Sequence, residues 1–231
     1  MEQIEILKSK LIEWGASAVG FTDIGTCADK RYDDLRYAIS IAVRLSDRII
    51  DEIENMPTYT YFHHYRTVNS LIDHITLKAG LLIQDWGHQY IAVPASQTVK
   101  DAAEQYSGIF QHKTAAVLSG IGWIGKSGLL ITPEFGPRVR LGTILTDMPL
   151  PIFKDKVGSG CKSCSLCTSS CPAMAIRGNE YDVEKGREYI VDAHACSQYM
   201  KNKFQHIGRG SVCGICVKVC PYGKTRRSID K

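Results

Sequence analysis

Residues 161–172 of this sequence read Cys161-Lys-Ser-Cys164-Ser-Leu-Cys167-Thr-Ser-Ser-Cys171-Pro172. Its spacing, C-x2-C-x2-C-x3-C-P, is the bacterial run that holds [4Fe–4S] clusters. Three closely spaced thiolates let one loop wrap three corners of a cubane, and the fourth cysteine then points toward a second cluster. The proline stops the loop and removes one amide donor.

A second run follows as Cys213-Gly-Ile-Cys216-Val-Lys-Val-Cys220-Pro221, and Cys196 lies between the two runs. Two cubanes need eight thiolates, and these two runs together with Cys196 provide eight. The crossed ligation of two-cluster ferredoxins predicts that one cluster is held by Cys161, Cys164, Cys167 and Cys220, and the other by Cys171, Cys196, Cys213 and Cys216.

Zinc is the main alternative occupant, because Zn²⁺ also takes four cysteines. The C-x2-C-x2-C spacing followed by Cys-Pro is unusual for zinc and favours iron. A disulfide framework is less consistent still with a cytosolic chain, where thiols stay reduced. Cys27 falls outside the pattern, and we interpret it as an ordinary small buried residue.

The composition is that of a globular protein with 231 residues, 44% hydrophobic and 23% charged. Net charge is +4, too small to indicate nucleic-acid binding by itself. Met1 to Lys10 is charged and helix-like, without the apolar core of a secretory signal, and no apolar run is long enough to span a bilayer. The expected location is therefore the cytoplasm, with no membrane association, and nine cysteines there indicate metal binding or catalysis.

The composition shifts at the Pro- and Gly-containing segment 149–160, since eight of the nine cysteines follow it. We therefore expect one domain over residues 1–150 and a cluster domain over 151–231. The first domain alternates helical and strand patterns, which predicts an α/β (α+β) layered fold. Helices are predicted over 4–14 and 61–86, and strands over 18–21, 38–43, 88–93 and 138–145.

A glycine-rich segment, Gly120-Ile-Gly-Trp-Ile-Gly-Lys126-Ser-Gly128, matches the P-loop pattern letter for letter. A P-loop follows a buried strand and opens a helix, whereas here 114–118 is helical in pattern and 129–132 is strand-like. We therefore interpret the segment as a tight turn from helix to strand. Its functional alternative is close approach of the backbone to a flat cofactor, with Lys126 as the charge.

Five other polar residues have more than one possible role. The tandem pair His63-His64 cannot share one helix face, so a two-histidine metal site is not expected and solvated or capping histidines are. Tyr106 is either a packing tyrosine or a proton donor. Arg138 and Arg140 alternate along one strand, where they are either surface residues or hold an anionic group.

Taken together, these motifs resemble epoxyqueuosine reductases and, more distantly, reductive dehalogenases. The resemblance runs from about Leu7 to Tyr222, nearly the whole length. Its most specific parts are the eight cysteines with both Cys-Pro pairs, the segment 119–127 and Leu141-Gly-Thr-Ile-Leu-Thr-Asp-Met-Pro-Leu150. The start, with Gly15-Ala-Ser-Ala-Val-Gly20 after an opening helix, and the long helix over 61–85 are also similar.

The resemblance implies a nitroreductase-like, cobalamin-binding layered domain followed by a two-cluster, bacterial-ferredoxin-like module. In that family the corrinoid lies base-off between the two parts, and electrons pass from the outer cluster through the inner one to cobalt. The protein supplies position, dryness and protons to the cofactor's chemistry. The residues we expect to meet the corrinoid are Gly122, Trp123, Ile124, Gly125, Lys126, Arg138 and Arg140.

Two departures from the family pattern bear on the substrate. Relatives that act on tRNA carry an aspartate as proton donor before the glycine-rich segment, and ungapped alignment puts Tyr106 there, as in dehalogenases. Those relatives often extend past the clusters with helical repeats, whereas this chain ends at Lys231, which is the pattern of a short form. With a net charge of +4, a small substrate is expected rather than tRNA.

The sequence thus predicts an iron–sulfur, corrinoid-dependent oxidoreductase that receives electrons from a low-potential donor of the ferredoxin or flavodoxin type. One alternative is an electron-transfer protein that reduces the corrinoid or flavin of a partner. A second alternative is epoxyqueuosine reduction in tRNA itself.

Overall fold

The computed structural model describes residues 2–25, 30–97, 99, 106, 108–153, 155 and 157–223. Two compact units are built from interleaved segments of the chain. Unit 1 comprises Met1–Arg44, Thr67–Ile121 and Arg140–Val157; unit 2 comprises Leu45–Arg66, Gly122–Val139 and Gly158–Lys231. The cysteine-rich part therefore folds with two earlier segments of the chain.

Unit 1 is organised around a four-stranded sheet of order β1-β2-β6-β3. Its strands are β1 (Ala18–Asp23), β2 (Tyr37–Arg44), β3 (Tyr90–Val93) and β6 (Val139–Thr146). β1 pairs with β2 in antiparallel register, with Gly20 opposite Ser40, and β3 pairs antiparallel with β6. These antiparallel pairs place the sheet on the α+β side of the expected fold class.

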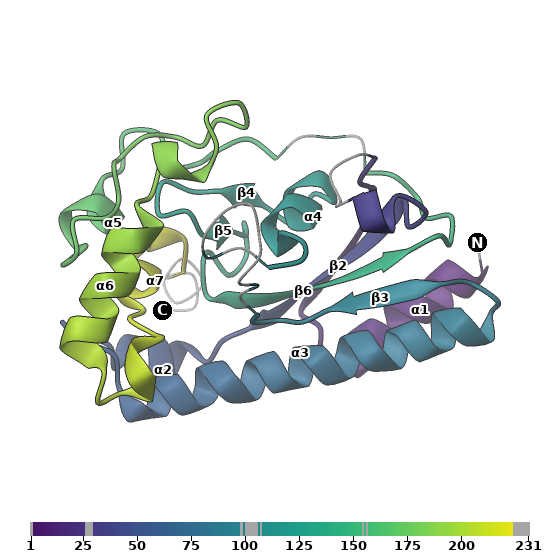
Figure 1. Cartoon of the computed structure of the whole chain (residues 1–231), viewed down its shortest axis with the longest axis horizontal. Helices are drawn as coiled ribbons and strands as arrows, with labels where there is room; N and C mark the ends of the chain where they lie inside the picture. Colours follow the sequence, from purple (N-terminus) through teal and green to yellow (C-terminus); the bar gives the residue numbers. More distant parts are fainter. Residues whose placement is uncertain are drawn as a thin grey trace, which may run out of the picture. The chain divides into compact units, whose positions relative to one another are not determined.

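The sheet is covered on both faces, with α1 (Glu2–Glu13) and α3 (Tyr59–Asp85) on one side and α4 (His112–Leu118) on the other (Figure 1). β2 is central, and six consecutive residues of it are buried, as a strand with two covered faces requires. One core cluster joins Ala38 of β2 and Leu145 of β6 to Ala115 of α4.

Two glycines allow helices to approach this sheet closely. A side chain at Gly142 of β6 would overlap Ile72 of α3, and one at Gly20 of β1 would overlap Ser119 at the end of α4. The hydrophobic face of α3 is thereby seated directly on the strand, which explains why Ile72, Ile75 and Ala79 are almost fully buried.

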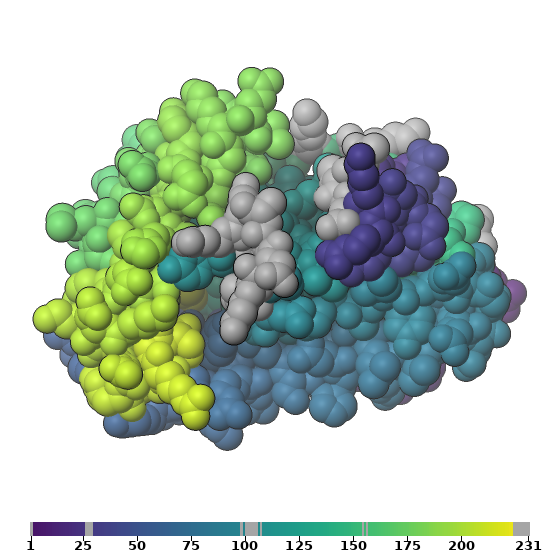
Figure 2. All heavy atoms as spheres, in the orientation of Figure 1, coloured from purple at the N-terminus to yellow at the C-terminus, as the bar shows by residue number. Residues whose placement is uncertain are grey.

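Unit 2 has little regular structure and is made of short elements. These are α2 (Asp47–Asp51), β4 (Trp123–Ile124), β5 (Leu130–Ile131), α5 (Leu166–Ser169), α6 (Ala193–Phe204) and α7 (Ile215–Val219), with the first turns of α3. α5 and α7 pack against each other. Parts of the segment 158–223 lie on the surface in Figure 2, and its buried residues are few, among them Ala175, Ile190 and Phe204. The hydrophobic core of unit 2 is small, which is typical of a module that depends on bound metal for its stability.

The helix and strand predictions from sequence are confirmed, with boundaries shifted by one or two residues. Gly15 and Gly87 follow α1 and α3 with φ of 115° and 88°, conformations that suit glycine past a helix end. The domain division at residue 150 stays a prediction, since compactness assigns 45–66 and 122–139 to unit 2. Among the described helices, none combines the length and the apolar character needed to cross a membrane.

Candidate iron–sulfur site

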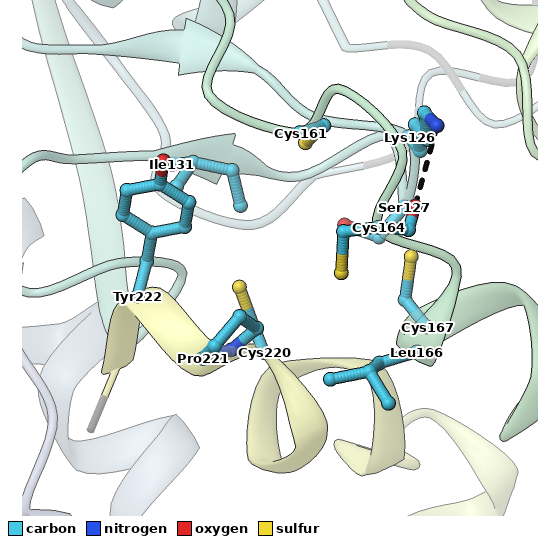
Figure 3. A pocket seen from close by; sticks show the side chains of 10 residues that line it. All are labelled: Lys126, Ser127, Ile131, Cys161, Cys164, Leu166, Cys167, Cys220, Pro221 and Tyr222. Carbon is cyan, nitrogen blue, oxygen red and sulfur yellow. Dashed lines mark hydrogen bonds between the residues drawn. The ribbon is translucent and has the colours of Figure 1, made fainter. Parts of the chain in front are cut away.

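Four cysteine sulfurs of unit 2 point into one cavity (Figure 3). They belong to Cys161, Cys164, Cys167 and Cys220, the set predicted from sequence to share a cluster. The remaining walls are formed by Lys126, Ser127, Ile131, Leu166, Pro221 and Tyr222. A cavity lined by four thiols from two separate runs fits the crossed ligation of a cubane.

Local backbone geometry places these sulfurs. The Cys164 N–H donates to the Cys161 carbonyl at 2.8 Å, which closes a tight turn with Lys162 at φ 39°. Cys167 lies within the short helix α5. Cys220 takes an extended conformation, φ −65° and ψ 124°, because the following Pro221 disfavours a helical residue before it, and α7 therefore ends there.

The electrostatics of the thiols show the same grouping. Burial, together with the neighbouring Cys161, Cys167 and Cys164, raises the pKa of Cys220 to about 11. Burial likewise raises the pKa of Cys167. Thiols in such surroundings are protonated at neutral pH in the metal-free chain. Positively charged iron would make them thiolates, so metal binding releases protons here.

The other four cysteines, Cys171, Cys196, Cys213 and Cys216, form a second group, whose thiols affect one another's pKa values. Burial raises the pKa of Cys196 to about 11, and the thiols of Cys213 and Cys171 contribute to the rise. The pKa of Cys216 is raised still more, first by burial and then by Cys213, Cys196 and Cys171. This is the second predicted ligand set, and the assignment of each cysteine to its cluster remains a prediction.

In the described part of the chain, no three His, Cys, Asp or Glu side chains are arranged to hold a single metal ion. Zinc requires its sulfurs to converge at about 2.3 Å from one point. A cubane is larger than a single ion, so its four sulfur ligands stand farther apart than zinc ligands do. The ligand set also consists of thiols alone, which is the usual set for a [4Fe–4S] cluster.

The glycine-rich segment lies against the cavity as a hairpin turn between β4 and β5. The Gly125 N–H donates to the Leu129 carbonyl at 2.9 Å, and a side chain at Gly125 would come within 3.3 Å of the Cys161 sulfur. The strand β5 follows the segment, so the interpretation that it is not a P-loop is confirmed. Glycine is needed here for close approach to the cysteine loop.

Lys126 contacts the cysteine loop, and its expected contact with a corrinoid stays a prediction. Its ammonium Nζ donates to the carbonyl of Lys162 at 2.5 Å and to that of Cys164 at 3.2 Å, the contact dashed in Figure 3. Gly122 and Gly125 both pack on Ile131, the first against its carbonyl and the second against its side chain. Ile124 lies in β4 opposite Leu130.

Trp123 presents an unused hydrogen-bond donor beside this site. Its ring is only 6% exposed and meets the ring of Tyr222 edge-on at 5.0 Å, while the Tyr222 hydroxyl donates to the Gly160 carbonyl at 3.1 Å. The indole Nε1 is buried and has no acceptor among the described residues. A buried donor without an acceptor fits a group that would lie against this wall when bound.

The two arginines have different partners. Arg138, 2% exposed, pairs with Asp47 at 3.1 Å and Asp51 at 2.9 Å, which favours a structural role over contact with a corrinoid. Arg140 donates through Nε to Asn69 Oδ1 at 2.8 Å. A corrinoid contact for either arginine stays a prediction.

Tyr106 lies in a turn with φ 63° and is 36% exposed. Residues 101–105 and 107 are outside the described part of the chain, so the proton-donor assignment stays a prediction. Cys27 is also outside the described residues. His64 accepts the Ser46 N–H at 3.0 Å through Nε2, so it links the start of α3 to the residue before α2, and the expected capping role stays a prediction.

Sequence reasoning missed the residues that support the second cysteine run. Asp47 and Asp51 of α2 hold Arg138, and Lys218 of α7 donates to the carbonyls of Asp51 and Ile53. The sequence offered one indication of this pairing. Asp47 and Asp51 are four residues apart, a spacing that puts two side chains on the same face of a helix.

Comparison with known proteins supports this reading of the site. Residues 160–223 match the family model described as a 4Fe-4S double cluster binding domain. An epoxyqueuosine reductase of Atelocyanobacterium thalassa is 26% identical over 89% of this chain and 68% of its own length. The tetrachloroethene reductive dehalogenase of Sulfurospirillum multivorans is 34% identical over 51% of this chain. The relation to epoxyqueuosine reductases and reductive dehalogenases is confirmed.

Solved structures show the same fold. The reductive dehalogenase NpRdhA in complex with 3-bromo-4-hydroxybenzoic acid aligns over 95% of this chain with a TM-score of 0.72 and 18% identity. The epoxyqueuosine reductase from Streptococcus thermophilus aligns over 97% with a TM-score of 0.61 and 19% identity. The expected mixed helix-and-sheet fold with an iron–sulfur region is therefore confirmed.

The chain spans only part of these relatives. The matched part is 25% of the Sulfurospirillum enzyme, 31% of NpRdhA and 67% of the Streptococcus enzyme. This chain therefore shares the fold and the double-cluster region with these relatives, whereas its activity and its substrate need separate evidence.

Proposed function

We propose that this protein is a corrinoid-dependent iron–sulfur reductase acting on a small substrate. The observation that carries the proposal is the cavity in which four cysteine sulfurs from two sequence runs face one another, with the glycine-rich hairpin as its wall. Relatives named as reductive dehalogenases and epoxyqueuosine reductases support a reductive reaction.

The cysteines would hold two [4Fe–4S] clusters, which accept electrons one at a time from a low-potential donor of the ferredoxin or flavodoxin type. The two ligand sets interleave along the chain, since Cys167 and Cys171 are four residues apart and belong to different sets. Their clusters would therefore be close neighbours, which suits electron transfer between them.

The residues proposed to meet a cobalamin lie beside the cysteine cavity, in the hairpin that contains Gly122, Trp123 and Gly125. The buried Trp123 N–H, which has no acceptor among the described residues, would be a donor for one of its amides, whereas the space next to the two glycines is taken by Ile131. Bound cobalamin would supply a strongly reducing metal centre. The chain's own tasks are to orient the ring, exclude water and deliver a proton, for which Tyr106 is the proposed donor.

Anaerobic purification with metal analysis and an absorption spectrum tests this function. We expect about eight iron atoms per chain from two cubanes, and a base-off cobalamin spectrum after hydroxocobalamin is added. Zinc without iron would refute the clusters. Eight irons with no cobalamin binding under reducing conditions would refute the reductase and favour an electron carrier. Queuosine missing from the tRNA of a deletion strain would point to epoxyqueuosine as the substrate.

A further inference from the structure

Lys126 reaches from the β4–β5 hairpin to the loop that carries the first cysteines. Its ammonium donates to two backbone carbonyls there, those of Lys162 and Cys164, and the side chain also lines the cavity into which the four sulfurs point. The Lys162 and Cys164 carbonyls lie 36 and 38 residues after Lys126 in the sequence, so the contact links two distant segments. A lysine in this position can affect both the shape of the loop and the charge around it.

The loop that carries Cys161 and Cys164 contains a backbone conformation at Lys162 that has to be stabilised. Lys162 has φ 39°, a left-handed conformation that non-glycine residues adopt at a cost. The turn closed by the Cys164 N–H and the Cys161 carbonyl depends on that conformation. By accepting from Lys126, the Lys162 carbonyl is held in the orientation that the turn requires.

The charge of Lys126 has no partner of opposite charge in the described part of the chain. No carboxylate there lies within ion-pair distance of its Nζ, and its two acceptors are neutral carbonyls. The cavity is partly buried, so a positive charge at its wall is less screened than one in water. A cluster becomes more negative when it accepts an electron, and a nearby cation favours that state.

We infer that Lys126 is a positioning residue of the cluster held by Cys161, Cys164, Cys167 and Cys220, and that it raises the reduction potential of this cluster. One electron enters the oxidised cluster and no bond or proton is exchanged; in the test below, dithionite supplies the electron. The inference rests on the iron–sulfur part of the proposed function and not on cobalamin.

The test is an anaerobic redox titration of the full-length protein, followed by electron paramagnetic resonance, on the wild type and Lys126→Met. We expect the potential of one cluster to fall while the other is unchanged. At a fixed ambient potential, the ratio of reduced to oxidised cluster should drop by about tenfold, which is 59 mV for one electron. Lys126→Arg, which keeps the charge, should stay near the wild type.

Lys203→Met is the matched control, because it removes an equal charge from the exposed last turn of α6 in the same unit. It should leave both potentials unchanged. Equal shifts in Lys203→Met and Lys126→Met, or no shift in either cluster, would overturn the inference. Wild-type protein without iron would instead refute the clusters themselves, so the two failures are distinguishable.

If Lys126→Met retains only about four irons, the double variant with Lys162→Gly separates the two roles. Glycine adopts φ 39° without strain, so the loop should again hold its cluster while the charge remains absent. Eight irons with a lowered potential in the double variant would support both roles. A double variant with a wild-type potential would overturn the electrostatic role.

Discussion

Arg138 and Asp51 form a buried ion pair, with the guanidinium Nη2 2.9 Å from the carboxylate Oδ1. The same guanidinium reaches Asp47 at 3.1 Å, so one arginine holds both ends of the short helix α2. Its side chain also packs on Gly223, where a Cβ would overlap it. The pair therefore ties α2 to the segment that directly follows Cys220.

Replacing Arg138 with Met should destabilise the folded protein, because the carboxylates of Asp47 and Asp51 lose a cation that pairs with both of them in a mostly buried place. Breaking a fully buried pair costs about 3–5 kcal/mol. Asp47 and Asp51 keep 19% and 24% exposure, so we expect a smaller loss of about 2–3 kcal/mol in the free energy of unfolding. Urea unfolding of iron-loaded protein measures it.

Arg177→Met is the control for this variant. Arg177 pairs with Asp192 at 3.9 Å, and both side chains are well exposed, so its loss should cost no more than about 0.5 kcal/mol. Equal stabilities for the two variants would show that the Arg138 pair contributes no more than a surface contact.

Cysteine replacements should remove the two clusters separately. Cys164→Ser alters the first ligand set and Cys213→Ser the second, so each should reduce iron from about eight to about four atoms per chain. The thiol sets are grouped accordingly in the structure. Iron analysis and electron paramagnetic resonance on anaerobic protein provide the readout. Loss of the same signal in both variants would contradict the predicted pairing.

The cysteine cavity was predictable from sequence because its ligands follow a spacing rule that metal geometry imposes. Cys161 and Cys220 are 59 positions apart, and the structure places both in the cavity where the crossed pairing predicts a shared cluster. The long helix and the strands were equally accessible, since buried faces repeat with fixed periods. The helices and strands depend on local sequence pattern, and the cysteine pairing depends on the number of ligands that each cluster takes.

The partners of long polar side chains were not predictable. Alternation along the strand linked Arg138 with Arg140, but their contacts depend on segments 91 and 71 positions away. Nothing in the sequence of the glycine-rich segment indicated that Lys126 donates to carbonyls of the cysteine loop. Backbone carbonyls leave no mark in a sequence, because every residue has one.

Tyr106→Phe tests the proposed proton donor. The ring remains and only the hydroxyl is lost, so iron and cobalamin contents should stay at wild-type values. General acid catalysis contributes roughly 10²–10⁴-fold, and turnover of the small substrate with a chemical low-potential donor should slow by that factor. An unchanged rate would identify Tyr106 as a packing or surface residue.

His112 makes the stability of unit 1 depend on pH. Its Nε2 lies 3.0 Å from the Pro94 carbonyl and its Nδ1 2.8 Å from the Thr143 hydroxyl. A carbonyl only accepts, so Nε2 carries the proton and Nδ1 accepts from Thr143. Burial lowers the pKa of His112 to about 4, from an ordinary value near 6.5, and the nearby Arg140 adds to the effect.

The sign follows from proton uptake. Between pH 6.5 and 4 the unfolded chain binds a proton at His112 that the folded chain excludes, so stability is full above pH 6.5 and declines as the pH falls toward 4. From pH 8.0 to 5.5 this one group should lower the free energy of unfolding by about 1.4 kcal/mol.

His112→Gln keeps an N–H for Pro94 and cannot titrate, so its difference in the free energy of unfolding between the two pH values should be smaller by that amount. His206→Gln controls for the loss of an imidazole elsewhere. Urea unfolding at both pH values decides the matter, and identical pH dependence in His112→Gln and the wild type would show that His112 takes up its proton equally in both states.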